Sequence, residues 1–267
     1  MKIVKAAAIG LAAVASLGLV AACASTSTTT SGASSSAAPS ATVSASAVSG
    51  ADRFTVAATN LKGAPYKFSF TSDATADAYT GSVDPLAGLT VANITIDVQS
   101  VKVTASAQLS STDYYVKING LDLLGISSTK YYHVDPTKIT GANPLIFGAP
   151  TDPTGASDLA GAVTSAEPEG ANQLKGTFDF TKQMWGPINA ATVTGLGASA
   201  KAVPFEATFD DKNRLTKITI SVPAFGSTKA ETITGTYSDF GVAVTPSTPA
   251  TADVVEAPDA LYNLLKG

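Results

Sequence analysis

Residues 94–118 decide the fold, and they read ITIDVQSVKVTASAQLSSTDYYVKI. Apolar side chains occupy every second position in three successive runs: Ile94, Ile96 and Val98; Val101, Val103, Ala105, Ala107 and Leu109; Tyr114, Val116 and Ile118. A period of two is typical of a β-strand with one buried and one solvated face. Because short polar segments separate the runs, we expect neighbouring strands joined by turns, as in an antiparallel meander.

The same alternation appears on both sides of this stretch. Further strands are predicted at 66–70, 79–83, 174–180, 203–210, 214–222 and 232–237, with a hairpin turn at 211–213. Helical spacing of apolar residues predicts a helix over 51–62, a second through about 184–196 and a short one at 261–265. Ser49 or Asp52 could cap the first helix, and Gly63 could end it.

The middle of the chain, residues 120–170, is dominated by prolines at positions 136, 144, 153 and 168. Proline removes a backbone donor and restricts its neighbour, so long regular elements are not expected there. Short helical pieces are predicted near Leu159 and Ala162. A loop-rich stretch of this length in a compact domain is usually functional or mobile.

This order predicts an α+β fold with a large curled antiparallel sheet of about nine strands and helices gathered on one face. Some inward-facing candidates are small, namely Ala105, Ala107, Ala207 and Gly235, and could leave an apolar cavity. The predicted wall of this lipid cavity comprises Phe68, Phe70, Ile94, Ile96, Val101, Val103, Ala105, Val116, Ile118, Phe205, Ala207, Ile218, Ile220 and Gly235. An alanine-rich core packed solid is the alternative, and either alternation phase could face inward.

The N-terminus resembles a bacterial signal peptide. Lys2 and Lys5 precede an apolar stretch that ends in Leu19-Val20-Ala21-Ala22-Cys23, which contains the only cysteine. We therefore expect a signal peptide at 1–22, lipidation of Cys23, and a Ser, Thr and Ala-rich disordered tether up to residue 50. A single domain then spans 51–267. The expected location is the extracytoplasmic face of the cell membrane, attached through the lipid anchor.

Composition and motifs argue against several functions. The formal net charge of −4 and the lack of a basic stripe argue against nucleic-acid binding. One histidine, His133, and one lipidated cysteine cannot supply a nitrogen or sulfur metal site. No nucleophile motif accompanies His133, and no phosphate or dinucleotide loop occurs. The sequence thus predicts neither an enzyme nor a cofactor.

Several motifs together carry a family resemblance. They are the lipobox and tether, Tyr66–Phe70, Thr112–Ile118, Tyr131–Ile139, Asp211–Leu215 and Thr236–Val244. In this order they resemble the LppX/LprA/LprF/LprG family of actinobacterial lipoproteins across the exported domain. The resemblance implies a half-barrel with helices on its concave face, similar to the LolA/LolB carriers. It also implies an apolar cavity for acyl chains of lipids or lipoglycans, transport across the envelope, and an export transporter as a further partner.

The chain departs from that family in places. The family typically has a tryptophan near Tyr131 and Tyr132, whereas the only tryptophan here is Trp185. The prolines between 144 and 168 and the helix after Pro258 look like additions. These departures leave the entrance and the ligand open. The competing functions are a structural or interaction lipoprotein with a packed core, and a hydrolase that depends on His133.

Overall fold

The computed structural model describes residues 49–98, 101–139 and 148–265, which belong to one compact unit beginning at residue 46. The predicted signal peptide, Cys23 and nearly all of the tether lie outside the described residues.

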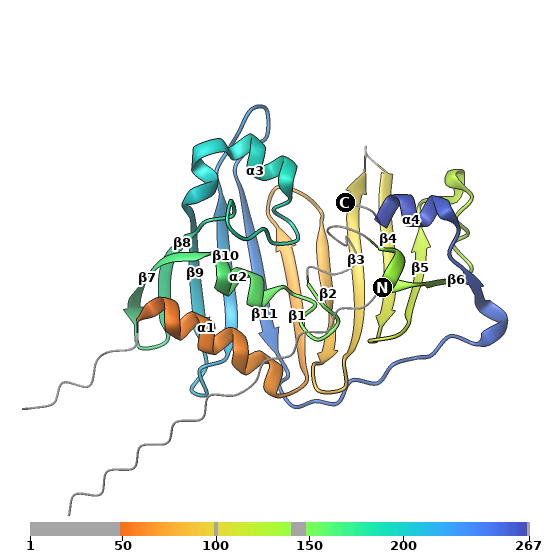
Figure 1. Cartoon of the computed structure of the whole chain (residues 1–267), viewed down its shortest axis with the longest axis horizontal. Helices are drawn as coiled ribbons and strands as arrows, with labels where there is room; N and C mark the ends of the chain where they lie inside the picture. Colours follow the sequence, from red (N-terminus) through yellow and green to blue (C-terminus); the bar gives the residue numbers. More distant parts are fainter. Residues whose placement is uncertain (1–48, 99–100, 140–147, 266–267) are drawn as a thin grey trace, which may run out of the picture. The chain divides into compact units, whose positions relative to one another are not determined.

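In the described ranges, twelve strands form a mixed sheet that is not closed into a barrel, in the order β12-β6-β5-β4-β3-β2-β1-β11-β10-β9-β8-β7 (Figure 1). The strands are β1 Tyr66–Ser72, β2 Ala78–Asp84, β3 Leu89–Val98, β4 Val101–Leu109, β5 Tyr114–Asn119, β6 Tyr131–Val134, β7 Val163–Gly170, β8 Gln173–Phe178, β9 Val203–Phe209, β10 Leu215–Val222, β11 Glu231–Ser238 and β12 Val254–Glu256. With the helices below, they make an α+β fold, as predicted.

The predicted alternation produces the sheet's two faces. In β4, Val103, Ala105, Ala107 and Leu109 are buried while the residues between them are not. Turn chemistry joins the strands, since Ser110 Oγ accepts from the backbone N–H groups of Thr112 and Asp113 before β5 begins. Asn213, at φ 53°, takes the left-handed position between β9 and β10 that asparagine tolerates.

The part of the chain that the structure describes also contains the α-helices α1 Gly50–Asn60, α2 Ala156–Ala162, α3 Ala190–Leu196 and α4 Asp259–Leu265. Ser49 caps α1, as one of the two predicted caps, by accepting from Asp52 N. α1 contacts α2, β7 and β10. Arg53 and Asn60 of α1 donate to the side chain and main chain of Asn213, which ties the helix to the β9–β10 hairpin.

The predicted helix through 184–196 is wrong in its first half. Gly186-Pro187 interrupts the helical pattern, and Asn189 starts α3 afresh by accepting from Ala191 N and Thr192 N. Trp185 is instead buried outside any helix.

The sheet is larger than predicted and not wholly antiparallel. The prediction missed β6, β7 and β12, and β12 pairs with β6 in parallel while the other neighbouring pairs are antiparallel. β6 and β12 are too short to show the two-residue alternation of a strand. In β7, Pro168 argues against a strand when only the sequence is considered. Proline is tolerated there because β7 is an edge strand.

Among the helices of the described part of the chain, none has the length and apolar character needed to cross a membrane.

Candidate functional site

The fourteen predicted wall residues share one face of the sheet, which we call the buried face. The strand register aligns half of them in one row across the sheet, next to Tyr79 of β2. In order from β5 to β9, this row contains Ile118, Ala105, Ile94, Phe70, Gly235, Ile218 and Ala207. In each of these strands, the residues that were predicted to face inward therefore lie together on the buried face.

On β1, β8 and β9, aromatic rings cluster on the buried face. Phe178 stacks on Phe205 at 4.1 Å between ring centroids, and Phe54 of α1 meets both rings. Phe70 packs against Trp185, with ring centroids 5.6 Å apart. This half has the dense packing of an ordinary core.

Gly235 corrects the expectation that small residues leave room. A Cβ atom built on Gly235 would lie 2.3 Å from Cε1 of Phe70, so the ring of Phe70 occupies the space in front of the glycine. Gly235 accommodates a neighbouring side chain, and a hollow at this position is not present.

On β3, β4 and β5 most side chains of the buried face are small or aliphatic, and the exceptions, Thr90 and Tyr114, lie at the end away from the β3–β4 hairpin. We call this surface the aliphatic face; it comprises Ala92, Ile94, Ile96, Val101, Val103, Ala105, Ala107, Val116 and Ile118. Ile96 and Val101 share its phase at the end of the β3–β4 hairpin, yet they are 36% and 49% exposed. An apolar track thus runs from solvent into the interior.

The segment 148–155 lies over the central strands, where the sequence predicted only an irregular loop. Tyr79 Oη and Thr90 Oγ1 donate to the carbonyls of Pro153 and Pro150, and Trp185 Nε1 donates to that of Thr154 at 2.7 Å. Asp152 accepts from Ala156 N and Ser157 N at the start of α2. These bonds hold the proline-containing segment in place.

Buried tyrosines beside this segment are kept neutral. Burial raises the pKa of Tyr66, and the negative charge of Asp152 raises it further. Burial likewise raises the pKa of Tyr79 and of Tyr237. These hydroxyls therefore stay protonated at neutral pH, and Tyr79 Oη donates its proton to the carbonyl of Pro153 instead of acting as a base.

Two open hollows lie elsewhere and are polar. One is on the opposite, solvated face of the sheet and is lined mainly by Lys67, Ser69, Thr80, Ser82, Asn93, Thr236 and Ser238. The other is lined by Asp73, Ala74, Thr75, Thr228, Lys229, Ala230 and Glu231. Their linings suit water or a polar molecule and do not suit a hydrocarbon chain.

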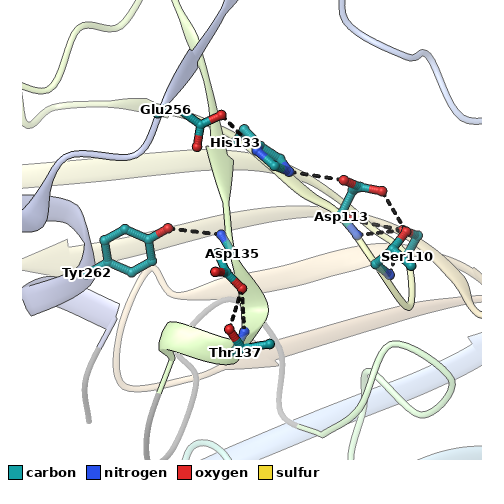
Figure 2. Close-up of polar contacts among 8 residues, drawn as sticks. Ser110, Asp113, His133, Asp135, Thr137, Glu256 and Tyr262 are labelled. Atoms are coloured by element: carbon teal, nitrogen blue, oxygen red, sulfur yellow. Dashed lines mark hydrogen bonds and ion pairs between the residues drawn. The ribbon is translucent and has the colours of Figure 1, made fainter.

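His133 has partners that the sequence could not indicate (Figure 2). Its Nδ1 lies 3.1 Å from Oε1 of Glu256 in β12, and its Nε2 lies 3.0 Å from Oδ1 of Asp113 in the β4–β5 turn. The pKa of His133 is raised, chiefly by the hydrogen bond to Glu256; burial opposes the shift and Asp113 adds to it. Glu256 is remote in sequence, so only the fold brings these groups together.

The arrangement around His133 does not resemble a catalytic triad, because both ring nitrogens face carboxylates and neither faces a nucleophile. Within the described ranges, no three His, Cys, Asp or Glu side chains are grouped so that they could hold a metal ion.

No family model and no curated protein matches the chain.

Proposed function

We propose that this protein is a lipid-anchored envelope protein that binds acyl chains of lipids or lipoglycans and carries them across the envelope. The chain would lie along the aliphatic face of β3 to β5. The observation that carries this proposal is the exposure of Ile96 and Val101. Both side chains lie on the buried face of the sheet, at the end of an otherwise buried apolar surface. A hydrocarbon entering there would first meet the apolar side chains of Ile94, Val103 and Ala105, while Thr90 and Tyr114 lie at the far end of these strands.

The energetics favour such a ligand. Each methylene transferred from water into an apolar site contributes about 0.8 kcal/mol, so a single long chain could bind without any polar chemistry. Ala92, Ala105 and Ala107 leave more space above the strands than leucine or phenylalanine would. The site proposed here is smaller than the sequence suggested, because aromatic rings occupy the other half of the buried face.

The family resemblance supports the same proposal. A sheet that curls into a half-barrel, with helices packed over its concave face, would place the aliphatic face inside the concavity. Attachment through Cys23 would keep the domain close to the membrane, since a flexible tether of this length reaches on the order of 28 Å.

A second function deserves a direct comparison, because one observation favours it. The ring of Phe70 against Gly235 and the cluster around Phe205 show dense packing over half of the sheet. If packing continues across β3 to β5, the protein is a structural or interaction lipoprotein that binds no lipid.

Charge placed at the exposed end of the aliphatic face separates the two functions. In Val101→Lys, an ammonium group stands where an acyl chain would enter, and we expect binding of a diacylated phospholipid to weaken by at least about tenfold. Native mass spectrometry of the full chain, incubated with the lipid in detergent, measures the bound fraction. The wild-type chain should retain lipid.

Val56→Lys is the matched control, because Val56 is 47% exposed on α1, away from the aliphatic face. It makes the same chemical change to a residue of similar exposure and should bind like wild type. A wild-type chain that retains no lipid, or equal binding by both lysine variants, contradicts the proposal.

A further inference from the structure

The last part of the chain pairs with the sheet through a short strand. After β11 the backbone forms no helix or strand until the 3-10 turn Thr251–Asp253, and then supplies β12 and α4. We call residues 254–265 the C-terminal segment. β12 pairs only three residues with β6, of which the last pair joins Glu256 to His133. So short a strand holds weakly by main-chain bonds alone.

Side chains add to this attachment. Ala257 N donates to His133 O at 2.9 Å. Tyr262 Oη accepts from Asp135 N at 3.0 Å, as Figure 2 shows. Leu261, Tyr262 and Leu265 are buried in the same apolar cluster as residues of β4, β5 and β6. Release of the C-terminal segment therefore exposes part of the buried face.

The hydrogen-bond geometry fixes the charge of His133. Ionised carboxylates only accept hydrogen bonds, so both ring nitrogens must donate to satisfy Glu256 and Asp113 together. The imidazolium does this, whereas a neutral ring can donate from one nitrogen only. Loss of the proton leaves a nitrogen lone pair facing a carboxylate.

We propose that His133 is a pH-sensitive latch for the C-terminal segment: the imidazolium holds Glu256, and with it β12 and α4, against β6, and the neutral ring loosens them. Loosening uncovers the sheet beside the aliphatic face, so the consequence for lipid loading rests on the function proposed above. The latch itself does not depend on it.

The other charged and titratable groups around His133 leave this direction unchanged. The Tyr115 ring of β5 lies 5.3 Å from the imidazole ring between centroids. Asp135, two residues further along, bonds to Thr137 and lies near Lys138. Asp113 stays on the sheet when the C-terminal segment leaves, so it favours the imidazolium in both states. Of the two carboxylates that contact His133, only Glu256 moves away when the C-terminal segment is released. The pH dependence of the attachment therefore comes from the contact between His133 and Glu256.

These contacts determine whether the C-terminal segment is held more strongly at low or at high pH. A histidine whose pKa is raised by its partners contributes its full stabilisation below the ordinary value of 6.5 and loses it as the pH rises through the raised value. The C-terminal segment is therefore held in mildly acidic solution and loosened in alkaline solution.

Hydrogen exchange on the full, lipid-free chain tests the latch. Protection of residues 254–265, corrected for the intrinsic pH dependence of exchange, should fall about two- to fivefold between about pH 6 and about pH 8.5. In Glu256→Gln the protection should be low and independent of pH, and His133→Gln should behave in the same way. Amides of β1 serve as the internal reference.

Asp253→Asn is the matched control, since it removes a carboxylate from the preceding turn and keeps the His133 contacts. It should keep the wild-type pH dependence. Equal protection at both pH values in wild type, or an unchanged pH dependence in Glu256→Gln, overturns the latch. Because no lipid is present, this outcome is separate from a failure of lipid binding by the wild-type chain.

Discussion

At the scale of single residues, aromatic rings lie close to glycines on the buried face of the sheet. A Cβ atom on Gly81 would lie 2.7 Å from Cζ of Phe68, and one on Gly176 would lie 2.9 Å from Cε1 of Phe205. Gly235 faces Phe70 in the same way. Each glycine permits a large ring to lie flat on the strand, which raises the packing density without a cavity.

Gly235→Ala should therefore lower the free energy of unfolding by about 1–3 kcal/mol, because the ring of Phe70 must move. Chemical denaturation followed by tryptophan fluorescence measures the change, since Trp185 packs against Phe70. Gly63→Ala is the control: nothing lies within 4 Å of the added atom, and its stability should stay close to that of wild type. A Gly235→Ala variant as stable as wild type would show that the ring is not confined.

The wall residues illustrate what a sequence can predict at this scale. The inward phase of Ile94, Ala105 and Ile118 follows from local alternation, and the register confirms that they share one face. The space in front of Gly235 depends on Phe70 of a distant strand. Local pattern has no access to that pairing, so the expected hollow at Gly235 was wrong.

At the scale of elements, the β9–β10 hairpin depends on one carboxylate. Asp210 accepts from Nε and Nη2 of Arg214, at 2.7 and 2.6 Å, and from the N–H groups of Lys212 and Arg214. Burial alone would raise the pKa of Asp210, but the bonds to Arg214 and Lys212 outweigh burial and lower it. The guanidinium also lies over the ring of Phe240, which connects the hairpin to the chain after β11.

Asp210→Asn should lower the free energy of unfolding by about 1–2 kcal/mol at neutral pH, since it removes a charge-assisted bidentate pair. A lowered pKa means that the carboxylate stabilises the fold above its ordinary value of 3.8 and ceases to do so as the pH falls through the lowered value. Denaturation at several pH values should show the difference from wild type shrinking in acid. Asp211→Asn, at the adjacent exposed position, should have little effect, and an equal loss in both variants would contradict the assignment.

Strands and helices with a long, uninterrupted pattern of apolar residues could be predicted from the sequence. Strands that form only because they pair with a segment distant in sequence could not. The strands from β1 to β5 follow the alternation, and the first helix follows its spacing and the cap at Ser49. β7 contains Pro168, which only an edge position permits. β12 has three residues and exists because β6 offers a free edge.

At the scale of the whole molecule, the two edges of the sheet are protected differently. β7 carries Glu167, Pro168 and Glu169, and charged residues and proline discourage pairing with another sheet. On the opposite side, β12 of the same chain pairs along β6 and forms the edge of the sheet. The histidine at this pairing gives this edge a dependence on pH that the other edge lacks.

The buried face is divided between two kinds of packing. Aromatic rings cluster between α1 and the strands β8 and β9, a part that we expect to be rigid, while small and branched aliphatic residues predominate on β3 to β5. This division restricts the proposed acyl site to one half of the sheet. The exposed apolar side chains of Ile96 and Val101 lie at the end of that half.

Photocrosslinking with a lipid that carries a diazirine on its acyl chain tests this division most directly. Tandem mass spectrometry of the irradiated full chain should place the label on β3 to β5, around Ile94, Ala105 and Ile118, and leave β9 to β11 unlabelled. Val101→Lys should lose most of the label, and Val56→Lys should keep it. Absence of labelling, or label spread equally over both halves of the sheet, would contradict the account.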